Sequence, residues 1–198
     1  MNISSSHLLK QWGLPVLLIL IALLFQLTGK SGFKILCYNR EQIIAWQWWR
    51  LFTGHLVHIS WMHFFMNTLA LILIQLLFSS FLSPWRLLLL IMVSASGIDL
   101  GLLLFNPEIK WYAGLSGVLH GLIAAGAVML ISKDAVKGAA LLIVLIFKLS
   151  WEQFVGSLPG SAEWTGAAVI TDAHLYGAIS GAIAAIFIIG ISHKEGIQ

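Results

Sequence analysis

Charged side chains are scarce in this chain of 198 residues, of which only 10% are charged and 59% are hydrophobic. A soluble domain carries about 25% charged residues, so the chain has too little charge to cover a surface that faces water. The composition therefore predicts that the lipid bilayer is its main solvent. The basic residues form no run typical of a nucleic-acid-binding patch, so no nucleic-acid partner is expected.

Cysteine is almost absent, since Cys37 is the single one, which excludes an intrachain disulfide and a paired-cysteine zinc site. The chain has no H-E-x-x-H motif, so a zinc protease of that type is not supported either. Several histidines nevertheless fall in or near apolar segments, and clustered imidazoles can bind a metal or haem. They are His55, His58, His63, His120 and His174. A metal or haem site therefore stays open as an alternative, although neither is the preferred interpretation.

Long apolar runs dominate the rest of the chain. They predict one all-α domain over residues 1–198, a polytopic membrane protein with six transmembrane helices. The expected spans are residues 13–28, 61–81, 87–105, 114–131, 135–154 and 173–191. The tryptophan-rich segment before the second span is expected to lie on or partly within one leaflet. Six spans place both termini on one side, but basic residues are divided almost evenly between the two sides and do not set the orientation.

Ser116 lies between glycines at the start of the fourth span, in Gly114-Leu115-Ser116-Gly117. A serine at a helix N-terminus can simply cap free N–H groups. The flanking glycines, however, allow close backbone approach, and a helix N-terminus offers unpaired N–H donors that can stabilise an oxyanion. Ser116 is therefore a candidate nucleophile.

His174 is the predicted partner of Ser116, because a histidine within a membrane span is costly and marks function more often than packing. Two G-x-x-x-G pairs, which allow helices to approach closely, lie near these two residues. The pairs are Gly117–Gly121 and Gly177–Gly181. We expect the fourth and sixth spans to touch through them, so that His174 can take the serine proton. The alternative is that the glycines serve packing only and His174 hydrogen-bonds a backbone carbonyl.

His63 and Asn67 are spaced i, i+4 and so share one face of the second span. Two donors projecting from that face could assist an oxyanion hole. The alternative is a structural hydrogen bond between helices, worth only about 1 kcal/mol.

Together these motifs resemble the rhomboid family of intramembrane serine proteases over about residues 49–181. The matching parts are Trp49-Arg50, His58 and His63 with Asn67, Gly114-Leu115-Ser116-Gly117, and Ala173-His174 followed by Gly177 and Gly181. The resemblance implies a Ser116–His174 dyad with no acidic third member, in which Ser116 attacks and His174 acts as base and then as acid. It also implies that His63, Asn67 and the Ser116 N–H hold the oxyanion. Gly114, Leu115 and His120 are expected beside the oxyanion or the bound substrate.

One position departs from the common rhomboid pattern. His120 stands where many rhomboids carry a tyrosine that stacks on the catalytic histidine, so His120 is expected either to stack on His174 or to compete as base. The string from Gly114 to Gly121 is similar to that of the bacterial rhombosortases. These are thought to cleave exported proteins that carry a C-terminal tail with a Gly-Gly motif, an apolar helix and a basic end.

The resemblance further implies a place and a set of partners. The protein would lie in the bacterial inner membrane among lipids, with both termini in the cytoplasm and the active site open to the periplasm. Its substrates would be the transmembrane tails of exported proteins, admitted past the loop over residues 156–171 and the fifth span. Two other functions remain open: a catalytically silent rhomboid-like protein that binds membrane clients, and a metal- or haem-binding membrane protein.

Overall fold

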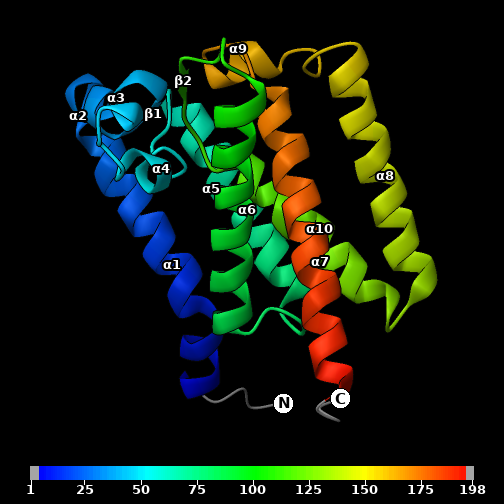
Figure 1. The fold of residues 1–198 in the computed structure, drawn as a ribbon. Coiled ribbons are helices and arrows are strands. Elements are labelled where there is room, and N and C mark those ends of the chain that lie inside the picture. The colour runs from blue at the N-terminus through cyan, green and yellow to red at the C-terminus, as the bar shows by residue number, and fades with distance from the viewer. Residues whose placement is uncertain (1–4, 195–198) are drawn as a thin grey trace.

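A computed structural model describes residues 5–194, and six long helices form the body of the molecule (Figure 1). They are α1 (Ser5–Leu27), α5 (Trp61–Phe78), α6 (Pro84–Phe105), α7 (Ser116–Ile131), α8 (Ala135–Phe154) and α10 (Thr171–Lys194). They run alternately up and down, and α1 begins at the end of the bundle where α10 finishes. The all-α, six-helix architecture is confirmed. The first predicted span began near residue 13, whereas its helix already begins at Ser5.

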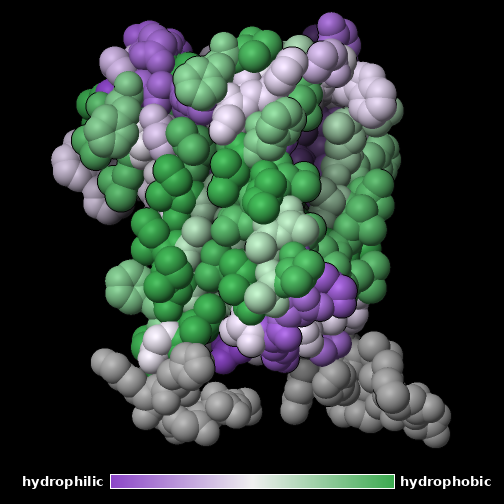
Figure 2. Space-filling view, turned by 90° about the vertical axis from the view of Figure 1, so that its right-hand side faces the viewer, coloured by the Kyte–Doolittle hydropathy of each residue, from purple (hydrophilic) through white to green (hydrophobic). Residues whose placement is uncertain are grey.

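Three of these helices, α5, α6 and α10, are long and apolar enough to cross a membrane. A fourth crossing is possible where Gln11–Leu27 of α1 and helix α2 (Gly29–Leu36) form a pair bent by 117°. Helix α7 is apolar but has only 16 residues, and α8 includes two lysines and a glutamate. That these two also cross stays a prediction. Figure 2 shows hydrophobic side chains covering the middle of one face and hydrophilic ones gathered at its two ends, as a bilayer requires.

The segment between α1 and α5 is folded rather than an irregular loop. It contains α2, strand β1 (Tyr38–Asn39), α3 (Arg40–Ile44) and α4 (Arg50–Thr53). Strand β1 pairs antiparallel with β2 (Trp111–Tyr112), so that Tyr38 faces Tyr112. The buried Arg50 guanidinium donates to the carbonyls of Lys34 and Cys37, at 2.9 and 2.8 Å. Arg50 thus holds α4 against α2 and Cys37, and the strand pairing ties the segment to the chain that leads into α7.

Short polar residues fix where several helices begin. The Ser60 hydroxyl accepts a hydrogen bond from the backbone N–H of His63 at 3.1 Å, which starts α5. Ser83 and Asp134 cap α6 and α8 in the same way. The cap at Ser60 places His63 in the first turn of α5, at the end of the bundle where the polar residues described below converge.

Helix α7 lies at the centre, packed against α5, α6, α8 and α10, and its contact with α10 is the most extensive in the bundle. The glycines explain this. A Cβ atom added to Gly177 would overlap the carbonyl oxygen of Gly117, and one added to Gly181 would overlap that of Gly121. The two backbones therefore touch directly, as the two G-x-x-x-G pairs predicted.

His58 lies in the loop between α4 and α5 and is buried. Its ring packs edge-to-face on the rings of His63 and Phe64, with centroids 5.0 and 5.6 Å away. Burial first, and the neighbouring His63 second, lower the pKa of His58 from 6.5 to about 3. The side chain is therefore neutral in the folded protein at physiological pH.

Replacing Gly177 by alanine should destabilise the protein by about 1–3 kcal/mol, because the added methyl group forces the α7 and α10 backbones apart. The measurement is the thermal or denaturant unfolding midpoint of the purified protein in detergent. Gly190→Ala is the matched control in the same helix, since nothing lies within 4 Å of its added Cβ. Equal destabilisation by both variants would contradict the close contact.

Lowering the pH from neutral to about 5 should lower the melting temperature less in His58→Phe than in the unsubstituted protein. Between its ordinary pKa of 6.5 and about 3, the unfolded chain binds a proton at His58 that the folded chain does not, so stability falls as pH falls. Phenylalanine keeps a ring in the same place and removes this dependence. Identical pH dependence in the two proteins would show that His58 is not held neutral.

Candidate active site

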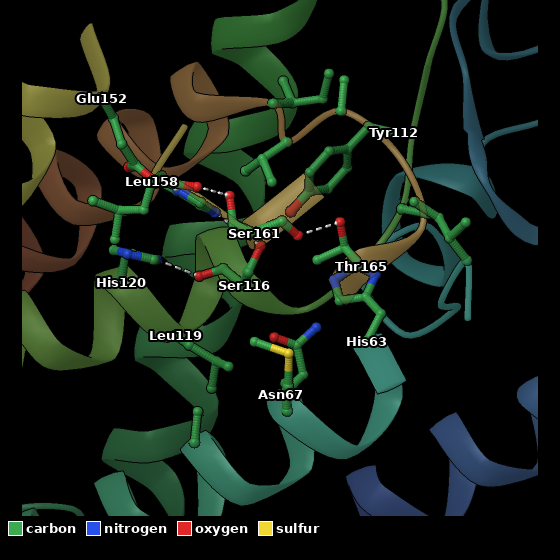
Figure 3. Close-up of a pocket in the computed structure, with 18 of the residues that line it drawn as sticks. His63, Asn67, Tyr112, Ser116, Leu119, His120, Glu152, Leu158, Ser161 and Thr165 are labelled. Carbon is green, nitrogen blue, oxygen red and sulfur yellow. Dashed lines mark hydrogen bonds and ion pairs between the residues drawn. The ribbon is translucent and has the colours of Figure 1, made fainter. Parts of the chain in front are cut away.

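A cavity of about 250 Å³ lies between α5, α7, α8 and α10, beneath α9 (Ser161–Thr165), in the half of the bundle away from the start of α1. Most of its wall is apolar. The polar side chains that line it include His63, Asn67, Ser116, His120, Lys148, Glu152 and His174. In Figure 3, Ser116 lies centrally, with His63 and Asn67 to one side of it and His120 and Glu152 to the other.

Ser116 and His174 meet in this cavity. The Ser116 Oγ lies 3.0 Å from Nε2 of His174, although the two residues are 58 positions apart in the sequence. Ser116 is the first residue of α7, and His174 lies in the first turn of α10. Because the two helices run in the same direction and touch through their glycines, their first turns lie side by side. A hydroxyl within hydrogen-bond reach of an imidazole is the arrangement of an activated nucleophile.

Gly114 shapes the approach to Ser116. Its φ angle is +117°, a conformation that glycine adopts without strain. Its N–H donates to the Gly54 carbonyl at 2.9 Å, and its own carbonyl accepts from the Tyr112 hydroxyl at 2.8 Å. A Cβ here would lie 2.7 Å from His63 Nε2 and 3.5 Å from Asn67 Nδ2. The loop that begins α7 is thus held directly against the two polar side chains of α5.

His63 and Asn67 present unused donors beside Ser116. Both side chains are buried, and neither His63 Nδ1 nor Asn67 Nδ2 has a hydrogen-bond partner among the described residues. Buried polar groups are nearly always paired, so such exceptions need a reason. The first backbone N–H groups of α7 also have no acceptor within their own helix. The region around Ser116 can therefore stabilise an added negative charge.

His120 stacks on His174, with ring centroids 4.1 Å apart and planes 19° from parallel. Its Nδ1 lies 2.7 Å from the Ser116 carbonyl oxygen, and its Nε2 lies 2.6 Å from Lys148 Nζ. Of the two alternatives that the family resemblance left open for His120, the structure shows the stacking. Because both ring nitrogens are engaged elsewhere, the geometry gives no support to His120 as a competing base.

Leu115, predicted beside the oxyanion or the substrate, lies outside the cavity wall, as do two of the five clustered histidines, His55 and His58. Leu115 packs in the hydrophobic core, together with residues of α5, α6 and α7. The Nε2 of His55 lies 3.3 Å from the Asp99 carboxylate, and His58 packs on His63. The five histidines therefore do not converge on one point, because the α4–α5 loop directs two of them into separate buried contacts.

Two residues that the sequence reasoning did not select, Lys148 and Glu152, complete the polar group. Nδ1 of His174 lies 2.9 and 3.1 Å from the two Glu152 carboxylate oxygens. Lys148 Nζ lies 2.7 Å from Glu152 Oε2. An acidic group next to the histidine differs from the dyad that the family resemblance implied. The available signal was a charged i, i+4 pair within an otherwise apolar helix.

His120, Glu152 and His174 also offer three ligand atoms within 4.8 Å of one another, a spacing that could hold a metal ion. Lys148 Nζ lies within 3.2 Å of all three residues. The ammonium group thus occupies the position that such an ion would take, and a metal would have to displace it.

Comparison with known proteins adds one finding. A family model described as Rhomboid domain matches residues 45–191, about three quarters of the chain, and this range includes every predicted site residue. No curated protein matches the chain.

Proposed function

The chain belongs to the rhomboid family of intramembrane serine proteases, and from this premise we propose that it is itself a protease with Ser116 as nucleophile and His174 as general base. The observation that carries the proposal is the 3.0 Å contact between Ser116 Oγ and His174 Nε2 inside a cavity among apolar helices. A multi-pass membrane protein with this pair in the wall of a cavity is suited to cut a peptide bond below the membrane surface.

The reaction follows acyl-transfer chemistry. Ser116 Oγ attacks the peptide carbonyl carbon while its proton passes to His174 Nε2. The tetrahedral intermediate collapses, and the leaving amine takes that proton from His174, which leaves an acyl ester on Ser116. Water then attacks the ester, His174 accepts a proton from it, and the serine hydroxyl is restored as the acid product leaves.

The negative oxygen of the intermediate needs donors that are already in place. We assign this role to the Ser116 backbone N–H, Asn67 and His63. The support is that Asn67 Nδ2 is buried and has no other partner among the described residues, and that the approach of Gly114 brings the Ser116 loop against both side chains. Gly114 serves here by leaving space, since any Cβ would collide with the His63 ring.

For the substrate we propose the C-terminal transmembrane tail of an exported protein, with a Gly-Gly motif near the cleavage site, as in the rhombosortase subgroup. The support is the resemblance of the Gly114 to Gly121 string and the presence of His120 where tyrosine is common. A helical peptide bond is shielded by its own hydrogen bonds, so the substrate must unwind before attack. Glycine lowers the cost of unwinding because it is a poor helix former.

We further propose a bacterial inner membrane location, with both termini in the cytoplasm and the cavity open to the periplasm. The cavity lies towards the end of the bundle that is opposite the start of α1 and the end of α10, which supports this orientation.

A catalytically silent client-binding protein is the second candidate, but it has no need for a hydroxyl bonded to an imidazole. A metal-binding role is disfavoured because the Lys148 ammonium group lies among His120, Glu152 and His174, the described residues that could together hold an ion.

Ser116→Ala and His174→Ala should each lower cleavage of a co-expressed Gly-Gly-tailed substrate by at least about 10³-fold, because each removes half of the nucleophile–base pair. Intact-mass analysis of the exported substrate measures cleavage, and immunoblotting shows that the variants accumulate in the membrane. Ser132→Ala, at the other end of α7, is the matched control and should cleave normally. Undiminished cleavage by Ser116→Ala would remove the proposal.

Fluorophosphonate labelling separates a protease from a silent binder. A protease should be labelled at Ser116, and prior inhibition should block substrate cleavage, since the reagent needs an activated hydroxyl. A client-binding protein should retain the substrate in a pull-down but take up no label.

His120→Tyr tests the subgroup. Tyrosine keeps a ring that can stack on His174, but it loses the Nδ1 contact with the Ser116 carbonyl and extends a hydroxyl towards Lys148. We expect cleavage of a general transmembrane substrate without Gly-Gly to fall by less than about tenfold, whereas cleavage of the Gly-Gly-tailed substrate falls further. Cleavage kinetics on the two substrates in detergent give the comparison. Equal losses would mean that His120 does not set specificity.

A further inference from the structure

The polar contacts around His174 agree with the arrangement of protons that a general base requires. For Ser116 to give up its proton, Nε2 of His174 must be the unprotonated nitrogen, so Nδ1 must carry the hydrogen. The group facing Nδ1 is the Glu152 carboxylate, at 2.9 and 3.1 Å, and a carboxylate accepts hydrogen bonds only. Glu152 thus favours the tautomer that a general base requires.

Lys148 fits the same arrangement. Its ammonium group donates to Glu152 Oε2 at 2.7 Å and to His120 Nε2 at 2.6 Å. His120 can accept there because its Nδ1 hydrogen is given to the Ser116 carbonyl. Lys148 Nζ and His174 Nδ1 are 3.2 Å apart. Both act as donors to the Glu152 carboxylate: Lys148 to Oε2, and Nδ1 to Oε2 and Oε1. In this arrangement His174 Nδ1, His120 Nδ1 and two of the three Lys148 N–H groups each face an acceptor.

The charges also balance. The Glu152 side chain is only 3% exposed, and a lone carboxylate at that depth would be costly. Lys148 supplies the opposite charge from one helical turn away on α8. The Lys148–Glu152 pair has no net charge. Before His174 accepts the serine proton, its neighbours on α8 therefore add no net charge beside it. The imidazolium that then forms lies against the carboxylate, which stabilises it.

We propose that Glu152 is a positioning residue that holds His174 in the tautomer able to accept the serine proton, and that Lys148 fixes the charge and orientation of Glu152. This role rests on the proteolytic function proposed above. It makes the site a Ser–His–Glu group with a lysine counter-charge, whereas the family resemblance implied a dyad alone.

Glu152→Gln is the most informative variant because it keeps the shape of the side chain. Lys148 Nζ donates to Oε2, so the glutamine should place its carbonyl oxygen there, 2.9 Å from His174 Nδ1, and its NH₂ group at the Oε1 position, 3.1 Å from the same nitrogen. His174 Nδ1 then faces a donor as well as an acceptor and no longer faces a negative charge, so the tautomer with protonated Nδ1 loses its preference. We expect the rate of Ser116 labelling by a fluorophosphonate to fall about 10²–10⁴-fold near neutral pH, while the melting temperature in detergent shows that the variant is folded.

Two further variants distinguish positioning from a loss of structure. Glu152→Asp restores a carboxylate on a shorter side chain and should label faster than Glu152→Gln. Adding Lys148→Met to Glu152→Gln frees the amide to rotate and present its oxygen to His174, so the double variant should label faster than Glu152→Gln alone. Glu41→Gln and Lys133→Met, both exposed, are matched controls that should label at the original rate.

A spectroscopic signature tests the tautomer without any turnover. In full-length protein labelled with ¹⁵N-histidine, the His174 signals, identified by their loss in His174→Ala, should report protonated Nδ1 before the change and a larger share of protonated Nε2 in Glu152→Gln. Labelling of Glu152→Gln within about threefold of the original rate, or an unchanged tautomer, would overturn the role of Glu152. Absence of labelling in the unsubstituted protein would instead contradict the proposed protease function, so the two failures are distinguishable.

Discussion

The direct backbone contact between α7 and α10 is the constraint on which the site depends. Gly177 lies on the carbonyl of Gly117, and Gly181 on that of Gly121, so the helices are as close as their backbones allow. Both helices begin at the same end, and Ser116 and His174 are in their first turns. In lipid there is no hydrophobic force to hold helices together, and close packing of small residues takes its place. The same glycines thus associate the helices and bring the hydroxyl to the imidazole.

A second set of contacts positions the other side of the cavity. The β1–β2 pairing and the bond from Gly114 N–H to the Gly54 carbonyl fasten the loop before α7 to the segment before α5, and the buried Arg50 holds that segment together. The Ser60 cap then sets the start of α5, from which His63 and Asn67 project. These contacts lie outside the helical core, where backbone groups can pair with one another away from lipid. The irregular part of the chain therefore determines where unused donors face Ser116.

The sequence predicted the helices, the α7–α10 contact and the Ser116–His174 meeting, because apolar run length and glycine spacing are local patterns with a direct physical meaning. It did not predict that Leu115 packs in the core, which depends on how the chain turns into α7, or that His55 pairs with Asp99, which depends on where the α4–α5 loop turns. It also missed Glu152. A charged pair on an apolar helix predicts that the pair faces something polar, but not which of five histidines it meets.

Glu152 and Lys148 belong to α8, which packs on α7 and α10 at the border of the bundle (Figure 1). Its exposed apolar side chains face outward, and on its inner side Leu145 and Leu149 pack beside the charged pair. Any outward swing of α8 would carry the carboxylate away from His174. Under the role proposed for Glu152, His174 would therefore be held ready to accept the serine proton only while α8 is packed in place, and admission of a peptide by parting α8 from the bundle would have to precede bond cleavage.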